Sequence, residues 1–192
     1  INAKPSLSAW PSHIVPQGQN VTLTCDTHNK FNIVMLYKEH GDPKLQVYKR
    51  MLQRSLLLGP VTRAFGGTYR CYGYTGQHHN ELSSPSEPLK IIISGLYKKP
   101  SLSALMGTVV TSEENMTLSC ISDHQFDMFH LSMKGVPQGH GLPAEKSHSG
   151  TFQANFLPVP LIQAETYRCY GSFRNSSHVW SSPSDPLYLS VS

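Results

Sequence analysis

An internal repeat constrains the fold of this 192-residue chain more than any other feature of its sequence. Four blocks of the first half recur in the second half: Lys4–Ala9 as Lys99–Ala104, Asn20–Cys25 as Asn115–Cys120, Thr68–Gly73 as Thr166–Gly171 and Ser83–Leu89 as Ser181–Leu187. The first two blocks are shifted by 95 positions and the last two by 98. A repeat of this length predicts two domains of one fold with very little linker. We expect one domain over residues 1–95 and the other over 96–192.

The four cysteines lie at equivalent positions of the two copies. A bond that is equivalent in both copies joins Cys25 to Cys71 and Cys120 to Cys169. Separations of 46 and 49 residues are far from a C-x-x-C metal spacing, so zinc ligation is disfavoured. We therefore expect one disulfide in each copy, and with it an oxidising compartment.

Alternating polarity around the cysteines predicts β-strands. Apolar and polar residues alternate over 20–25 and over the repeat of that segment, which is the period-2 pattern of a strand with one face in a core. The same parity places Tyr69 and Tyr167 inward, two residues before the second cysteine, where an immunoglobulin sandwich has its tyrosine corner. The core Trp of antibody-type domains is replaced by Leu36 and Leu131. The predicted fold class is all-β, with two tandem immunoglobulin-like (C2-type) β-sandwich domains.

The formal net charge of +4 originates in the first copy, where Lys and Arg outnumber Asp and Glu. Four of its cations lie close together in the sequence: Lys44, Lys49, Arg50 and Arg54. Such a cluster favours a polyanion such as heparan sulfate, and the alternative interpretation is a solvated strand face without a ligand. The sequence contains neither an aromatic-interleaved RNA motif nor a zinc-knuckle spacing, so we expect no nucleic-acid partner.

Three N-glycosylation triplets begin at Asn20, Asn115 and Asn175. The strand parity points the first two asparagines outward, which favours a secreted or cell-surface protein. No run of about 18 apolar residues occurs. Because the sequence begins at Ile1 and not at Met, we expect a processed or trimmed piece whose membrane anchor lies outside it.

The sequence contains ten histidines, a residue type that can act as a catalytic base or a metal ligand. No H-E-x-x-H, G-x-S-x-G or paired C-x-x-C motif accompanies them. The predicted strands place His78, His79 and His178 on exposed loops and His130 on an outward strand face. We therefore predict that the protein is not an enzyme and has no catalytic residue, metal or cofactor.

Several motifs together carry a family resemblance. They are the Lys-Pro-Ser-Leu-Ser-Ala openings, Leu36-Tyr37-Lys38-Glu39, the paired Thr-Tyr-Arg-Cys-Tyr-Gly blocks, the Gly95-Leu96-Tyr97 junction and Trp180-Ser181-Ser182-Pro183-Ser184. These motifs resemble the leukocyte-receptor immunoglobulin superfamily and, within it, the killer-cell immunoglobulin-like receptors. Copy one resembles the outermost domain of that family and copy two its membrane-proximal domain, as in the receptors that lack the middle domain.

The resemblance implies the ligand-binding ectodomain of a natural killer or lymphocyte receptor, extracellular and belonging to a single-pass membrane protein. It implies recognition of MHC class I or class I-like protein on another cell, which would regulate cytotoxic cells. A signalling adaptor or phosphatase would act only through segments absent from this sequence. The alternatives are a related leukocyte receptor with a non-MHC ligand, such as heparan sulfate bound through the basic first domain, and self-association.

Family members build their ligand surface from the interdomain elbow and from loops at one end of the second sandwich. Carried over by position, the implied contacts are Leu96, Tyr97 and Lys98 at the elbow, Gln125, Phe126 and Asp127 after Cys120, and Asn175, Ser177, His178 and Val179 before Trp180. The family usually has acidic residues where this chain has Lys98, Asn175 and Val179.

Overall fold

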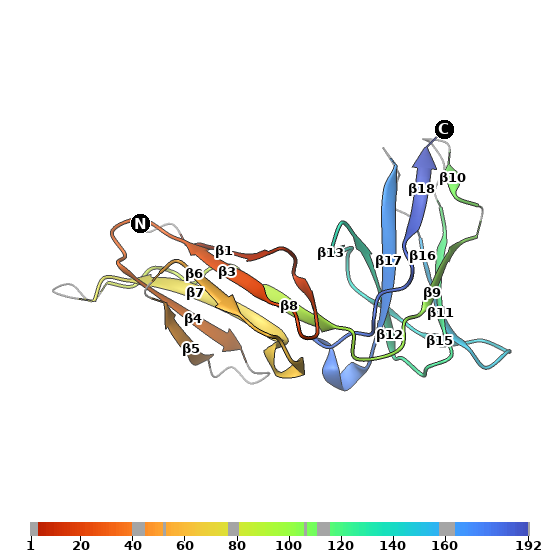
Figure 1. The fold of residues 1–192 in the computed structure, drawn as a ribbon, viewed down its shortest axis with the longest axis horizontal. Coiled ribbons are helices and arrows are strands. Elements are labelled where there is room, and N and C mark those ends of the chain that lie inside the picture. Colours follow the sequence, from red (N-terminus) through yellow and green to blue (C-terminus); the bar gives the residue numbers. More distant parts are fainter. Residues whose placement is uncertain are drawn as a thin grey trace. The chain divides into compact units, whose positions relative to one another are not determined.

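The computed structural model describes residues 4–39, 45–51, 53–76, 81–105, 107–110, 116–157 and 164–191. In these segments the chain forms β-strands and two short 3-10 helices, η1 (Arg63–Phe65) and η2 (Arg174–Ser176) (Figure 1). Contacts between Cα atoms divide the chain into two compact units, Ile1–Ile93 and Ser94–Ser192. Within the described segments, no helix has the length and apolar character needed to cross a bilayer.

The first unit is a sandwich of two sheets. Its strands are β1 (Ser6–Trp10), β2 (Ile14–Pro16), β3 (Val21–Asp26), β4 (Ile33–Glu39), β5 (Leu45–Met51), β6 (Ser55–Leu58), β7 (Gly67–Tyr74) and β8 (Leu89–Ser94). One sheet has the order β1-β3-β6 and the other β2-β8-β7-β4-β5. The first two strands therefore belong to different sheets, so the chain crosses from one layer to the other at Pro11–His13.

The second unit repeats this plan. Its strands are β9 (Ser101–Ala104), β10 (Val109–Val110), β11 (Leu118–Ser122), β12 (Met128–Met133), β13 (Val136–Pro137), β14 (Leu142–Pro143), β15 (Glu145–Lys146), β16 (Phe152–Phe156), β17 (Glu165–Ser172) and β18 (Leu187–Val191). One sheet has the order β15-β16-β11-β9 and the other β10-β18-β17-β12-β13, with β14 also paired to β12. The all-β, two-sandwich fold class predicted from the sequence is confirmed.

The cores form because alternate side chains of facing strands point between the sheets. In β3 and β7 the burial of successive residues alternates along the whole strand. A disulfide joins Cys25 to Cys71 across the first sandwich, and a second joins Cys120 to Cys169 across the second. Their Cα atoms are 6.3 and 6.4 Å apart, within the range that disulfides bridge.

Two predicted core features can be compared with the structure. Leu36 and Leu131 fill the position of the missing Trp and are 0% and 7% exposed. The hydroxyl of Tyr69 donates to the carbonyl of Phe65 over 2.7 Å, which is the predicted tyrosine corner. Tyr167 is also buried, but the loop equivalent to that of Phe65 lies outside the described residues.

Buried serines complete the backbone hydrogen bonding beside β7 and β17. The hydroxyls of Ser83 and Ser86 accept from the N–H groups of Gly73 and Cys71 over 2.8 and 3.0 Å. In the second unit, Ser181 and Ser184 accept in the same way from Gly171 and Cys169, both over 2.9 Å. The repeated Ser-Ser-Pro-Ser segments thus satisfy donors that a neighbouring strand would otherwise have to pair.

Candidate ligand-binding loops of the second domain

The segment 96–98 is fixed to the second sandwich by its backbone and by one aromatic ring. The N–H of Leu96 donates to the carbonyl of Trp180 over 3.3 Å, and the N–H of Ser182 donates to the carbonyl of Tyr97 over 2.8 Å. The Tyr97 ring packs edge-on against Phe126 and Phe173, with centroid distances of 6.0 and 5.0 Å. Lys98 follows directly and is exposed.

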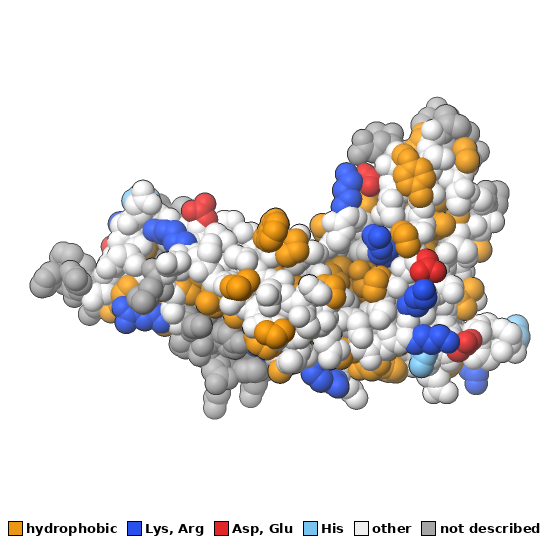
Figure 2. All heavy atoms as spheres, in the orientation of Figure 1, with side chains coloured by type: hydrophobic (Ala, Val, Ile, Leu, Met, Phe, Trp, Pro, Cys, Tyr) orange, Lys and Arg blue, Asp and Glu red, His pale blue; other side chains and the backbone are white. Residues whose placement is uncertain are grey.

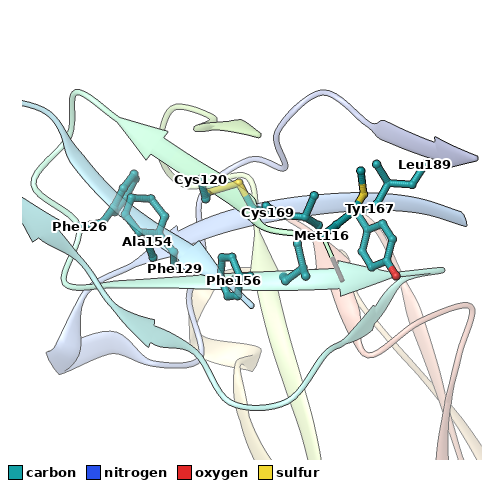
Figure 3. Close-up of a cluster of buried hydrophobic side chains, with 11 residues drawn as sticks. Met116, Cys120, Phe126, Phe129, Ala154, Phe156, Tyr167, Cys169 and Leu189 are labelled. Carbon is teal, nitrogen blue, oxygen red and sulfur yellow. A yellow bond between two sulfur atoms is a disulfide. The ribbon is translucent and has the colours of Figure 1, made fainter. Parts of the chain in front are cut away.

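The loop after Cys120 contributes Phe126 to the core of the second domain. Phe126 is 1% exposed, and a Cβ atom added to Gly171 would overlap its ring. In Figure 3 Phe126 lies beside Phe129 at one end of the core cluster, while Tyr167 and Leu189 lie at the other end.

Asp127 joins this loop to the loop that follows β17. Its carboxylate accepts from the N–H of Arg174 over 2.7 Å, at the start of η2, and its own N–H donates to the carbonyl of Ser172 over 2.9 Å. A carboxylate that accepts from the first N–H of a helical turn stabilises that turn. Asp127 therefore positions η2, and one of its carboxylate oxygens is already occupied.

The loop before Trp180 is anchored by that Trp side chain. Trp180 is 3% exposed, and its Nε1 donates to the carbonyl of Ser177 over 3.1 Å. Its ring stacks on His130, with centroids 4.1 Å apart and planes 12° apart, and it lies 5.1 Å from the Tyr170 ring. His130 Nε2 in turn lies 2.7 Å from the hydroxyl of Ser172. His130 is on the outward strand face that the sequence predicts, and Trp180 covers it there.

The residues carried over from the family fall into three groups. Phe126 and Val179 are buried and cannot touch a partner without a rearrangement of the loops. Asp127 is half-buried and engaged. The residues whose side chains are available to a partner are Lys98, Gln125, Asn175 and Ser177, which are exposed, and Leu96, Tyr97 and His178, which are half-buried.

Comparison with the first copy identifies why Phe126 is buried. Phe31 lies at the equivalent position, is 0% exposed, and packs on Gly73 as Phe126 packs on Gly171. The sequence carried this signal, because both phenylalanines and both glycines recur in the repeat.

Of the four residues predicted to bind a polyanion, the structure describes the side chains of Arg50 and Arg54. Lys44 and the side chain of Lys49 lie outside the described residues, and Arg50 is exposed on β5. Arg54 uses its guanidinium internally, donating to the carbonyls of Thr27, His28 and Phe31 over 3.0, 3.4 and 3.2 Å.

The remaining sequence predictions concern glycosylation, histidines and metals. Asn20 and Asn175 are exposed, whereas Asn115, His78 and His79 lie outside the described residues. Within the described segments, no three His, Cys, Asp or Glu side chains gather as metal ligands would. On the face seen in Figure 2, acidic and basic side chains of the second domain are interspersed.

Comparison with known proteins identifies the family. An immunoglobulin-domain family model matches residues 11–84. Killer cell immunoglobulin-like receptor 3DL1 of Rattus norvegicus is 42% identical over 288 residues, covering 97% of this chain and 68% of that protein. The chain belongs to the killer cell immunoglobulin-like receptor family. The receptor of the same name from Mus musculus is also 42% identical, over 289 residues, covering 97% of this chain and 66% of that protein.

Killer cell immunoglobulin-like receptors are non-enzymatic receptors of the cell surface, so this chain is an immune-receptor ectodomain and not an enzyme. Among solved structures, the human OSCAR ligand-binding domain is 29% identical, with a TM-score of 0.46. That match covers 98% of this chain and 99% of the OSCAR chain.

Proposed function

We propose that this killer cell immunoglobulin-like receptor ectodomain recognises an MHC class I or class I-like protein on another cell. The contact surface is formed by the exposed and half-buried loop residues of the second domain. Phe126, Asp127 and Val179 act beneath that surface and hold its shape. In the intact receptor, recognition would regulate cytotoxic cell activity.

The observation that supports this proposal is that three segments distant in sequence are tied together at one end of a single sandwich. Ring contacts of Tyr97 join the elbow segment to Phe126 and to Phe173, and the carboxylate of Asp127 joins the loop after Cys120 to η2. Loops held in this way lose little conformational freedom on binding, so more of the interaction free energy becomes affinity.

The charges of these loops favour an acidic surface on the partner. Lys98 and Arg174 are exposed and outnumber the exposed carboxylate of the loop after Cys120, Asp123, because the carboxylate of Asp127 accepts from the backbone of Arg174. We therefore expect carboxylates opposite Lys98, and an association rate that falls as salt is added. In this respect the chain departs from the acidic residue that the family usually has at this position.

The alignment with the curated relatives supports a receptor without a middle domain. It extends over 288 residues, whereas this chain has 192, so a stretch of about one domain's length in the rat receptor has no counterpart here. This agrees with copy one being the outermost type and copy two the membrane-proximal type.

The test is staining of matched cells, with and without β2-microglobulin, by the tetramerised and glycosylated ectodomain. We expect staining that requires β2-microglobulin and that falls about ten-fold for Lys98→Glu, because a favourable ion pair becomes a repulsion. Lys90→Glu is the matched control, since Lys90 is exposed on β8 of the first domain and lies outside the proposed surface.

Staining that persists without β2-microglobulin would overturn recognition of MHC class I. Staining that requires β2-microglobulin but responds to Lys90→Glu and not to Lys98→Glu would move the contact surface to the first domain.

A further inference from the structure

The outward face of the sheet β5-β4-β7 in the first domain carries two rows of side chains, which are apolar or aromatic except for Arg50. In the first row, Met35 of β4 is the register partner of both Arg50 on β5 and Tyr72 on β7. In the second row, Ile33 pairs with Tyr74, and Tyr74 forms a bridge with Leu82. Their strand neighbours Val34, Leu36 and Cys71 point into the core, so these rows face outward.

These six residues surround a hollow of about 270 Å³: Ile33, Met35, Arg50, Tyr72, Tyr74 and Leu82. Sites for drug-sized ligands typically measure roughly 300 to 1,000 Å³. The hollow is thus sized for one or two side chains of a protein partner.

The repeat explains why this hollow exists. At the equivalent place in the second domain, Trp180 lies against His130 and Tyr170 and is only 3% exposed. In the first domain the Trp position is occupied by Leu82, which is 56% exposed, and the His position by Met35. The smaller side chain leaves open the space that an indole ring fills in the other copy.

Among the described side chains that line the hollow, Arg50 is the one cation. Arg50 is exposed, and no described carboxylate forms an ion pair with it. Neighbouring cations of the same domain are engaged: Lys30 pairs with Glu81 at 3.1 Å, and Arg70 with Glu39 at 2.6 Å. Tyr and Arg are among the side chains that are enriched where proteins bind one another.

We infer that this hollow binds a protein segment in which a large apolar side chain lies next to a carboxylate. The apolar side chain packs among Met35, Tyr72 and Leu82, and the carboxylate accepts hydrogen bonds from the guanidinium of Arg50. The site lies on the first domain and does not depend on the ligand proposed for the second.

The test titrates the complete isotope-labelled chain with two capped peptides and follows backbone amide signals. The first peptide has a phenylalanine between aspartates, and the second has asparagines in place of the aspartates. We expect shifts centred on residues 33–35, 72–74 and 82, and binding of the neutral peptide about ten-fold weaker, as for loss of one charge-assisted hydrogen bond.

Two variants and one control make the assignment specific. Leu82→Trp should fill the hollow as Trp180 does in the second domain and abolish the shifts. Arg50→Gln should make the two peptides bind equally. Leu57→Trp is the control, because Leu57 is 65% exposed on β6 in the other sheet, and this variant should bind like the wild type.

The inference is overturned if millimolar acidic peptide shifts none of these amides, or if Leu82→Trp leaves the shifts unchanged. Equal binding of both peptides to the wild-type chain would overturn the role of Arg50.

Discussion

Arg54 shows how a charged side chain in this receptor stabilises a loop. Its guanidinium donates to the carbonyls of Thr27, His28 and Phe31, in the connection from β3 to β4, while its own carbonyl accepts from the N–H of Cys25. A basic residue in a positively charged domain suggested a polyanion contact, but sequence distance alone does not show that three carbonyls converge on it. In the structure, the guanidinium of Arg54 holds the connection from β3 to β4 in place.

We expect Arg54→Met to lower the free energy of unfolding by about 1 to 2 kcal/mol, because it removes charge-assisted hydrogen bonds and keeps most of the apolar stem. Arg63→Met is the control, since Arg63 is exposed in η1, and it should change stability by less than about 0.5 kcal/mol. Urea unfolding measures both. Equal effects of the two variants would mean that the loop does not need the guanidinium.

Ser86 is a second residue whose contribution to stability can be tested, because its buried hydroxyl accepts from the N–H of Cys71 beside the disulfide. We expect Ser86→Ala to cost about 1 to 3 kcal/mol, since it leaves a buried donor unpaired. Ser84→Ala, at an exposed position two residues earlier, should be close to neutral. Thermal unfolding of the two variants under non-reducing conditions makes the comparison, and a neutral Ser86→Ala would show that water replaces the hydroxyl.

Side-chain packing on the outward face of β12 and β17 removes one polar group of the second domain from water. Tyr170 of β17 is 6% exposed, beneath Trp180 and opposite His130 of β12. Burial raises the pKa of its hydroxyl above the ordinary 10.0, while a hydrogen bond with Ser132 and the charge of Arg168 lower it. The net raised pKa means that the folded state holds this proton more tightly than the unfolded chain does.

The contribution of Tyr170 is therefore fully present below pH 10.0 and is lost as the pH rises through the folded-state pKa. We expect the urea midpoint of the wild-type chain to fall above this pH, and to fall less steeply for Tyr170→Phe, which has no proton to lose. Burial raises the pKa of Tyr37 and Tyr167 as well, so part of the fall should remain. Tyr188→Phe, at a 59% exposed residue of β18, should follow the wild type. An equal fall of the urea midpoint with pH for the wild type and for Tyr170→Phe would contradict this explanation.

The internal repeat explains which strands, disulfides and loop contacts could be predicted from the sequence. Strand parity, the cysteine pairing and the Tyr69 corner all follow from local alternation and from the spacing of the copies. The role of Asp127 was not visible in this way, because its hydrogen bond to Arg174 joins residues 47 positions apart in two irregular loops. The cover that Trp180 places on His130 has the same cause, since a ring stack between a strand residue and a residue of the segment after η2 leaves no periodic signal.

For the molecule as a whole, the proposed ligand surface and the glycosylation triplets meet at one position. Asn175 is exposed in η2, among the loop residues proposed to contact the partner. A glycan attached there would occupy volume that the partner must enter, whereas a glycan at Asn20 would lie on the first domain. Whether the second domain can bind a large protein therefore depends on whether Asn175 carries a glycan.

We expect Asn175→Gln, expressed in glycosylating cells, to raise tetramer staining of β2-microglobulin-positive cells by about ten-fold or more, because removing a steric block restores contacts worth at least one hydrogen-bonded pair. Ser177→Ala destroys the same triplet without changing Asn175 and should also raise staining, although it removes one hydroxyl of the proposed contact surface. Asn20→Gln removes a glycan from the other domain and should leave staining unchanged. The contrary result would be wild-type staining by both Asn175→Gln and Ser177→Ala, although mass spectrometry shows a glycan on Asn175 of the wild-type protein. The loop before Trp180 would then lie outside the contact, and the contact surface would consist of Leu96, Tyr97, Lys98 and Gln125.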